Sequence, residues 1–381
     1  MCEIRSSQPV CVAADQAPIV IGQSAPITGT NQELGTEAKR GVELAFKEKN
    51  EAGGVRGRAL RLEFRDDGYQ PELAEEAARD LVDAQVLRRP PKCPSTSAAA
   101  PPISTTALER GPNGVLAFIG NVGTPTMLRA APVAIESGTI FFAAITGASP
   151  ILREKDESCG RFVFNVRASY AQEARATVEY FKQRGVPDYR HILSFDQNDS
   201  FGQAGYDGLV DAYEAVFEPL PDRAAPESAL HRFRYARNDD TSVPQQVTRA
   251  TAYIADLLRS SPGRHKVGIL MTDTYGAAAT FIEQVRRWQY ANDSEQAALD
   301  KARRLDLYLS NVSFVGANAL AERLVSAGKI ATPAGELAFA ENVVVSQVVP
   351  NYQSDASEIV AQYNRLIKQS GSEPSFTSFE A

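Results

Sequence analysis

The sequence predicts an α/β fold built on parallel sheets, and three observations lead to this prediction. Short apolar runs alternate with amphipathic stretches of helical length, which is the pattern of parallel strands joined by crossover helices. Turn residues follow the apolar runs, as in Ser24–Gly29 after the first of them. The chain has 381 residues, 43% of them hydrophobic and 23% charged, which suits a globular protein with room for two lobes.

The elements of the amino-terminal part are predicted from hydrophobic periodicity. Ile19–Gly22 is an apolar run expected to form a buried strand. The next stretch carries one apolar stripe at helical spacing and ends at Gly53-Gly54; the stripe consists of Leu34, Ala38, Val42, Ala45 and Phe46. Further strands are expected at 60–64, 115–120, 140–144 and 162–166, and further helices at 72–82 and 124–136.

The rest of the chain continues the same alternation. Helices are predicted at 171–184, 202–217, 247–259, 277–288, 317–327 and 357–369. Strands are predicted at 191–195, 267–271, 305–309 and 343–349. The pattern therefore extends over almost the whole sequence.

Two stretches depart from this pattern. Residues 86–112 carry six prolines and a Ser/Thr/Ala-rich run, which disfavours a helix or a central strand. We expect an exposed insertion there, either a docking loop or a tolerated surface excursion. Residues 1–16 lack the apolar core of a secretory signal peptide, so they are interpreted as disordered, an expression remnant or the stub of a removed signal. The Met1-Cys2 start leaves a lipid-anchored cysteine open.

Composition and spacing exclude several classes of site. The formal net charge is -7, so no basic surface for nucleic acid is expected. No apolar run approaches the roughly 20 residues of a membrane helix. The cysteines and histidines lack metal-ligand spacing, so no metal site is expected. One or two disulfides could form outside the cytoplasm, with the pairing open among Cys2, Cys11, Cys93 and Cys159.

A ligand is expected at the loops that follow the strands, because ligands of open parallel sheets gather at the carboxyl ends of the strands. Three of these loops are small, polar and glycine-bearing, so their backbone N–H groups can approach a ligand closely. They are 24–29 with Thr28, 121–126 with Asn121, Gly123 and Thr124, and 146–150 with Thr146, Gly147 and Ala148. Thr124 stands where a helix begins; it either helps to bind a carboxylate there or serves only as the N-cap.

Catalysis is not expected. The sequence contains no nucleophile elbow, P-loop or dinucleotide-binding glycine motif, so we expect no cofactor. The carboxylates at Asp66, Asp67, Asp196 and Asp199 have no histidine or cysteine near them in a motif. We therefore interpret the Asp66-Asp67 pair as turn chemistry.

Several segments in a fixed order carry a resemblance to a known family. They include IVIGQSAPITG, AFIGNVGTPTM, TGASPILR, FNVRASYAQEA, DSFGQAGYDGL, VSFVGANALAERL and VSQVVP, together with a first helix that ends in Asn-x-x-Gly-Gly-Val-x-Gly. In these segments the chain resembles the type I periplasmic binding proteins of the branched-chain amino acid-binding (Leu/Ile/Val-binding) class. The resemblance covers residues 18–381 apart from the insertion.

The resemblance implies two Rossmann-like lobes with parallel sheets, joined by a hinge and closing on a ligand. Lobe 1 would cover 17–165 plus 350–381, and lobe 2 would cover 166–349. The family continues past the PSFTSFEA that ends this sequence. The resemblance therefore implies a truncated C-terminal part, with an apolar face of lobe 1 left uncovered.

The resemblance also implies individual ligand contacts. Thr124 matches the hydroxyl residue of the family that takes the ligand carboxylate, and Thr146 and Ala148 match contacts in the next loop. From lobe 2, Phe201 matches the aromatic residue that closes over the ligand. Two further lobe 2 positions follow less directly: a second aromatic contact near Thr274 or Tyr275, and Tyr170, which lies either near the cleft or in hinge packing.

One position departs from the family pattern. The glutamate that pairs with the ligand's ammonium group falls on Ser313, and a neutral serine cannot offset a buried cation. Asp273 or Asp199 could substitute. The ligand therefore stays open between an amino acid, an amide and a small or aromatic carboxylate.

The function that the resemblance implies is solute capture for an ABC importer, in the periplasm or otherwise outside the cytoplasm. The expected partners are a small-molecule solute and the membrane permease of the transporter, with no nucleic acid. The alternative is a ligand-sensing domain that uses the same fold within a receptor or regulatory system.

Overall fold

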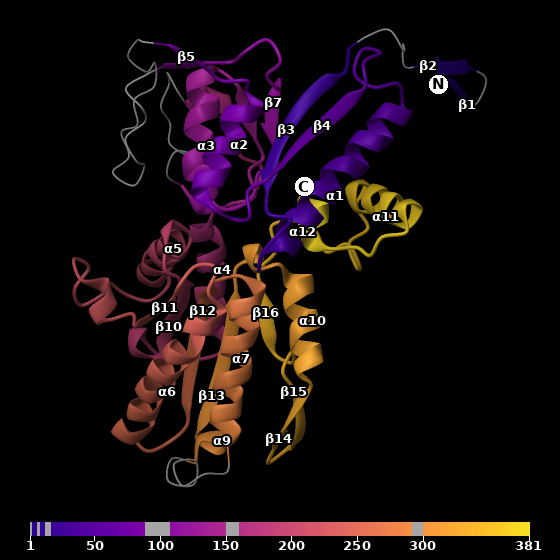
Figure 1. Cartoon of the computed structure of the whole chain (residues 1–381). Helices are drawn as coiled ribbons and strands as arrows, with labels where there is room; N and C mark the ends of the chain where they lie inside the picture. The colour runs from indigo at the N-terminus through magenta and orange to yellow at the C-terminus, as the bar shows by residue number, and fades with distance from the viewer. Residues whose placement is uncertain (1, 6–7, 12–16, 88–106, 150–159, 292–299) are drawn as a thin grey trace. The chain divides into compact units, whose positions relative to one another are not determined.

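The computed structural model of the chain describes residues 2–5, 8–11, 17–87, 107–149, 160–291 and 300–381 (Figure 1). The chain divides into two compact units. Unit 1 comprises Met1–Arg167 and Val349–Ala381, and unit 2 comprises Ala168–Val348. These bounds differ from the expected lobe bounds by two residues at the first boundary and one at the second. No helix among the described residues is both long and apolar enough to span a membrane.

Unit 1 is built on a five-stranded parallel sheet in the order β4-β3-β7-β8-β9. Its strands are β3 (Ile19–Ala25), β4 (Leu60–Asp66), β7 (Ala117–Ile119), β8 (Ile140–Phe142) and β9 (Val163–Phe164). The crossover helices are α1 (Gln32–Glu51), α2 (Pro71–Leu81) and α3 (Thr124–Ser137). The sheet confirms the prediction of parallel strands joined by helices.

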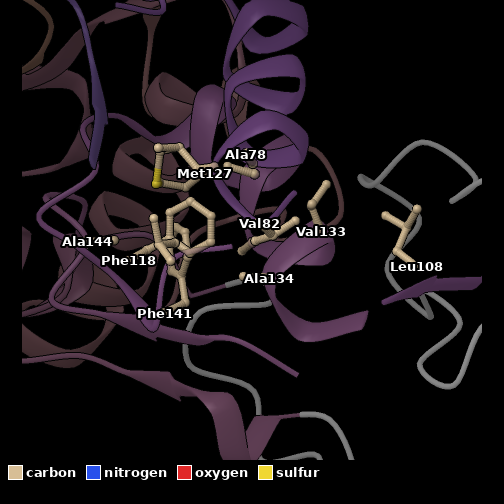
Figure 2. Close-up of a cluster of buried hydrophobic side chains, with 13 residues drawn as sticks. Ala78, Val82, Leu108, Phe118, Met127, Val133, Ala134, Phe141 and Ala144 are labelled. Atoms are coloured by element: carbon tan, nitrogen blue, oxygen red, sulfur yellow. The ribbon is translucent and has the colours of Figure 1, made fainter. Parts of the chain in front are cut away.

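The main apolar core of unit 1 lies between its sheet and helices α2 and α3 (Figure 2). The rings of Phe118 on β7 and Phe141 on β8 lie 5.6 Å apart at their centroids, beneath Met127 of α3. Strand residues alternate between the two faces of a sheet, so Ile140 and Phe142 point away from this core. Both are 40% exposed, which leaves an apolar strip on the opposite face of β8.

The ends of the predicted insertion are ordered, which corrects the expectation of an exposed excursion over all of 86–112. β5 (Gln85–Leu87) pairs antiparallel with β6 (Ala107–Glu109). Leu108 of β6 is 1% exposed and belongs to the core shown in Figure 2. The proline-rich residues 88–106 lie outside the described residues, as do Cys93 and Cys159. Within residues 1–16, interpreted from the sequence as disordered or a remnant, β1 (Cys2–Arg5) and β2 (Gln8–Cys11) pair antiparallel, which corrects the interpretation of disorder for these two segments.

The C-terminal residues return to unit 1 and pack on helix α1. α11 (Glu358–Ser370) and α12 (Phe376–Glu380) build a second apolar cluster with Leu44 of α1, which includes Tyr352, Val360, Tyr363 and Ile367. A Cβ atom at Gly41 would lie 2.2 Å from the carbonyl oxygen of Ser378, so only glycine permits this close approach. The segment after 349 is therefore an integral part of unit 1.

Unit 2 repeats the same architecture with a sheet in the order β11-β10-β12-β13-β16, and every pair is parallel. The strands are β10 (Ile192–Gln197), β11 (Arg232–Tyr235), β12 (His265–Thr272), β13 (Leu305–Asn311) and β16 (Val343–Val345). The helices are α4 (Tyr170–Gln183), α5 (Ser200–Val216), α6 (Val243–Ser260), α7 (Tyr275–Tyr290), α9 (Lys301–Arg304) and α10 (Ala317–Ala327). An antiparallel hairpin of β14 (Lys329–Thr332) and β15 (Gly335–Ala338) follows α10.

Candidate ligand-binding site

Each unit has one point where the order of its strands reverses. In unit 1 the chain moves from β3 to β4 on one side and later to β7 on the other side of β3. In unit 2 it moves from β10 to β11 and later to β12 on the other side of β10. Ligands of doubly wound sheets bind beyond the carboxyl ends of the strands at such points. Each unit therefore has its own candidate ligand-contacting edge, at β3/β7 in unit 1 and at β10/β12 in unit 2.

In unit 1, two threonine hydroxyl groups meet at this edge. The Oγ1 atoms of Thr124 and Thr146 lie 2.7 Å apart, and both residues are buried. The backbone N–H of Ala148 donates to Thr146 Oγ1 at 3.2 Å. The structure thus brings together three of the predicted contacts, from loops 121–126 and 146–150, and Gly147 lies buried between two of them.

The loop before α3 is shaped by Gly123. This residue has φ of +99°, and a Cβ atom on it would lie 2.5 Å from Tyr69 Cε2. Gly123 is the N-cap of α3, so Thr124 is the first residue of the helix and the alternative that Thr124 is the N-cap is wrong. The first-turn N–H groups of an α-helix lack partners within the helix and favour an anion. Thr124 and Thr126 supply such groups here, since Pro125 has none.

Two amides at the same edge keep unused hydrogen-bonding capacity. Both side-chain polar atoms of Asn121 are buried without a partner among the described residues. Gln23 donates from Nε2 to the carbonyl oxygen of Gly120 at 2.9 Å, and its Oε1 is buried without a described partner. Buried amides are normally hydrogen-bonded, so this edge is polar and incompletely satisfied.

Thr28 occupies a different environment from the other predicted contacts of unit 1. It is exposed, and its hydroxyl donates to Asp66 Oδ2 at 2.7 Å. Asp66 also accepts from the N–H groups of Ile27 and Gly68 at 3.0 Å each. Burial raises the pKa of Asp66, but the hydrogen bond from Thr28 and the backbone bonds outweigh it and the net pKa is lowered. The interpretation of Asp66-Asp67 as turn chemistry agrees with these contacts.

In unit 2, three predicted aromatic contacts stand in the first turns of helices. Tyr170 begins α4, Phe201 is the second residue of α5, and Tyr275 begins α7. The Phe201 ring lies 5.3 Å from Tyr170 and 4.8 Å from Phe314, and it is 0% exposed. Tyr170 and Phe201 are thus packed in the interior of unit 2, and their role as ligand contacts stays a prediction.

Tyr235 of β11 forms hydrogen bonds with residues at the carboxyl ends of β10 and β12. This residue was not predicted from the sequence. Its hydroxyl donates to Gln197 Oε1 at 3.1 Å and accepts from the backbone N–H of Thr274 at 3.1 Å. Thr274 is the N-cap of α7, directly before Tyr275. The guanidinium of Arg323 lies 4.9 Å from the centroid of the Tyr275 ring.

Ser313 has a carboxylate beside it, although it is not one itself. The backbone N–H of Ser313 donates to Glu173 Oε2 at 2.7 Å, and Ser346 Oγ donates to the same oxygen at 2.6 Å. Glu173 is 4% exposed on α4. Glu173 and Ser313 are 140 residues apart in the sequence, so no local sequence pattern could predict that they are hydrogen-bonded.

Asp273 and Asn311 form the most distinctive polar pair of unit 2. Asn311 Nδ2 donates to Asp273 Oδ1 at 2.7 Å, and both residues are 0% exposed. The remaining oxygens, Asp273 Oδ2 and Asn311 Oδ1, are buried without a partner among the described residues. Burial raises the pKa of Asp273 well above its ordinary value, the Asn311 bond only partly offsets this, and the charges of Asp240 and Asp196 add to it.

Asp199, the other candidate substitute, is committed to local structure. It caps α5 by accepting from the N–H of Phe201 at 2.8 Å, and its second oxygen accepts from Gln197 Nε2. Asp196 is likewise paired, with Arg232 Nη2 2.8 Å from its Oδ1. Asp273 is therefore the carboxylate at this edge with an unused oxygen. Within the described ranges no three His, Cys, Asp or Glu side chains are grouped as a metal site.

These observations define a two-unit α/β protein with polar loops at both strand-order reversals, which is the architecture of solute-binding proteins. A family model described as "Periplasmic binding protein" matches residues 18–101 and 100–287. The chain belongs to the periplasmic binding protein family. Members of this family bind solutes outside the cytoplasm and are not enzymes, which agrees with the predicted lack of catalysis.

Two curated relatives match shorter stretches. The Leu/Ile/Val-binding protein BraC3 of Rhizobium johnstonii is 34% identical over 113 residues, which are 30% of this chain and 29% of the relative. The Leu/Ile/Val-binding protein homolog 3 of Brucella melitensis is 39% identical over 70 residues, 18% of this chain and 19% of the relative. The matched part thus spans less than a third of either relative.

A solved structure matches almost the whole chain. It is described as a possible leucine/isoleucine/valine-binding protein from Rhodopirellula baltica and is 28% identical, with a TM-score of 0.69. The match covers 98% of this chain and 80% of that protein. The predicted type I periplasmic binding fold of the Leu/Ile/Val-binding class is thereby confirmed.

Proposed function

We propose that this chain is the solute-binding component of an ABC importer and captures a small amino acid. The observation that carries this proposal is the pair of hydroxyl groups of Thr124 and Thr146 at the start of α3, whose Oγ1 atoms lie 2.7 Å apart. The Ala148 N–H donates to the Thr146 hydroxyl oxygen beside them. Two hydroxyl groups and the first-turn N–H groups of a helix form a donor set suited to one carboxylate. The names of the two curated relatives, both Leu/Ile/Val-binding proteins, support the same class of solute.

The other end of the ligand is assigned to unit 2. Asp273 Oδ2 and Asn311 Oδ1 are two buried acceptors without described partners, and an ammonium group supplies the N–H donors that they lack. This assignment resolves the problem raised by Ser313, because Asp273, directly after β12, offers a carboxylate that is hydrogen-bonded to Asn311 of β13. The capture of one solute by both lobes through hinge closure, which the family resemblance implies, is part of this proposal.

Three matched probes separate the two ends of the ligand. Leucine carries both charged groups, leucinamide lacks the carboxylate, and 4-methylpentanoate lacks the ammonium group. Titration calorimetry of the chain should give the tightest binding for leucine. If neither leucine nor a wider panel of amino acids bound, the proposed function would be wrong.

Variants at the two ends should discriminate among these probes. Thr146→Val should weaken leucine and 4-methylpentanoate by about fivefold or more, because a charged acceptor loses a donor worth about 1 kcal/mol, and should spare leucinamide. Asp273→Asn should weaken leucine and leucinamide and spare 4-methylpentanoate. Thr251→Val is the matched control, since this buried hydroxyl of α6 donates to carbonyl oxygens of its own helix, those of Val247 at 2.9 Å and Thr248 at 3.2 Å. An equal loss for all three probes would refute the assignment of ends.

The partner and the location follow from the same proposal. A closed, liganded form would be recognised by the membrane permease of the importer, outside the cytoplasm. A lipid anchor at Cys2 stays a prediction, which mass spectrometry of the protein from its native membrane would check.

A further inference from the structure

A hollow of about 380 Å³ lies at the amino-terminal edge of the unit 2 sheet. Its walls come from the end of α4, the end of α7, the start of β13 and the residues around β15. The register shows which edge this is: Leu305 pairs with His265 at the start of both strands, whereas Asn311 pairs with Met271 near their carboxyl ends. The hollow is thus at the opposite end of the strands from Asp273 and Asn311.

The hollow exists because β13 is longer than its neighbour β16. β16 pairs only with Leu309–Asn311, so the first residues of β13 have no strand beside them on that side among the described residues. All four of these residues, Leu305–Tyr308, line the hollow. An uncovered strand edge offers backbone hydrogen-bonding groups to whatever fills the space. Gln289 uses one of them by donating to the Leu305 carbonyl oxygen at 2.8 Å.

Three arginines give the hollow a positive charge. Arg286 is 5% exposed, and its guanidinium donates to the carbonyl oxygens of Ala338 and Glu341, which are neutral acceptors. Burial lowers the pKa of Arg286, and the nearby charge of Glu341 only partly offsets this. Among the described residues no carboxylate lies within ion-pair distance of Arg286, and Glu341 acts on this buried cation only through the longer-range effect of its charge.

The other two arginines stand at the rim. Arg264 pairs with Asp306, with Nη2 and Oδ1 2.6 Å apart, which uses the carboxylate that lines the hollow. Arg184 lies over the Tyr180 ring, 5.1 Å from its centroid. It makes no carboxylate ion pair within the described ranges. Two of the three positive charges are therefore available to an anion.

Three tyrosines provide flat walls beside these charges. The rings of Tyr180 and Tyr308 pack edge to face with their centroids 6.2 Å apart. Tyr290, the last residue of α7, also lines the hollow. Aromatic rings flanking a cationic group favour a ligand with a planar body and an anionic end. The volume lies within the range of small-molecule sites, roughly 300–1,000 Å³.

We propose that this hollow is a second ligand site, which binds a small aromatic carboxylate. The carboxylate pairs with Arg286 and Arg184, and the ring packs against Tyr180 and Tyr308. The site does not depend on the solute site proposed above, because it uses none of the same residues. A ligand there would touch α7, the helix that also begins beside Thr274 at the other edge of the sheet.

The binding of an aromatic carboxylate in this hollow can be measured by titration calorimetry. Benzoate is the smallest probe with a ring and a carboxylate, and benzamide is its neutral counterpart. Titration calorimetry with benzoate should show saturable binding, and benzamide should bind at least about tenfold more weakly because it lacks the charge.

Variants decide whether the signal comes from the hollow. Arg286→Gln and Arg184→Gln should each weaken benzoate by about tenfold, and the exposed Arg184 keeps the test valid if Arg286→Gln fails to fold. Arg287→Gln is the matched control, because Arg287 pairs with Glu283 at 2.7 Å and does not line the hollow. Thr146→Val should leave benzoate binding unchanged. No benzoate binding, an undiminished affinity in Arg184→Gln, or a loss of benzoate binding in Thr146→Val would overturn the proposal.

Discussion

At the scale of single residues, Asp273 is a buried acid of the candidate site that has an oxygen without a described hydrogen-bond partner. Its carboxyl group is fully buried, accepts one hydrogen bond from Asn311 and has a second oxygen without a described partner. Such a group is costly to keep in a fold unless a ligand uses it. Arg232 shows the contrasting case, since its side chain is 1% exposed but donates hydrogen bonds to Asp196. Arg232 is thus a buried charge whose hydrogen bonds are made within the protein, whereas Asp273 keeps one oxygen without a described partner.

The raised pKa of Asp273 predicts how stability depends on pH. The folded protein holds a proton that the unfolded chain releases above the ordinary pKa of 3.8. The stability from this proton is complete below that value and is lost as the pH rises towards the raised pKa. Asp273→Asn should therefore raise the melting temperature relative to the unsubstituted chain, by an amount that grows as the pH rises from about 4 to 7.

The measurement is a set of thermal unfolding curves over this pH range without ligand. Asp207→Asn is the control, because Asp207 is exposed on α5 and accepts only from Gln203 among the described residues. A melting temperature for Asp273→Asn that follows the control at every pH would show that Asp273 is not a strained buried acid.

At the scale of elements, periodicity predicted most strands and helices but missed those that charge or proline conceals. β11 has the sequence Arg-Phe-Arg-Tyr, and its two arginines are not typical of a buried strand. The first of them, Arg232, is nevertheless buried because it pairs with Asp196. β6 was missed because it lies within the proline-rich stretch 86–112, yet it places Leu108 in the core.

The loops of unit 1 could be located because glycine and threonine follow predicted strands. The pairings of Asp273 with Asn311 and of Glu173 with Ser313 join distant segments and leave no local pattern.

The alternation along β8 gives a matched pair of substitutions. Phe141 is 1% exposed and packs on Phe118, whereas Phe142 is 40% exposed on the opposite face. Phe141→Ala should cost about 3–5 kcal/mol of unfolding free energy through loss of burial and the cavity left behind. Phe142→Ala should cost about 1 kcal/mol or less. Urea denaturation of both variants measures the difference, and equal costs would contradict the assigned faces of β8.

At the scale of the whole molecule, two units of the same architecture each present a polar edge at a reversal of strand order. The lobes, the hinge and the solute-binding role were expected from a resemblance in ordered motifs, and the fold and the family are now established. Hydrophobic periodicity without the resemblance predicts only an α/β class. The sequence left the chemistry of the ligand open, because the position expected to hold a glutamate carries Ser313. Only the structure separates Asp273, which has an oxygen without a described partner, from Asp199, whose two oxygens are both paired.

The most direct test of the central claim is a crystal structure of the chain with bound leucine. The proposal expects the leucine carboxylate within hydrogen-bonding distance of Thr124, Thr146 and the Ala148 N–H, and the ammonium group against Asp273 and Asn311. Leucine density that touches only one unit, or an ammonium group bound away from Asp273, would contradict the claim that one solute is held by both edges.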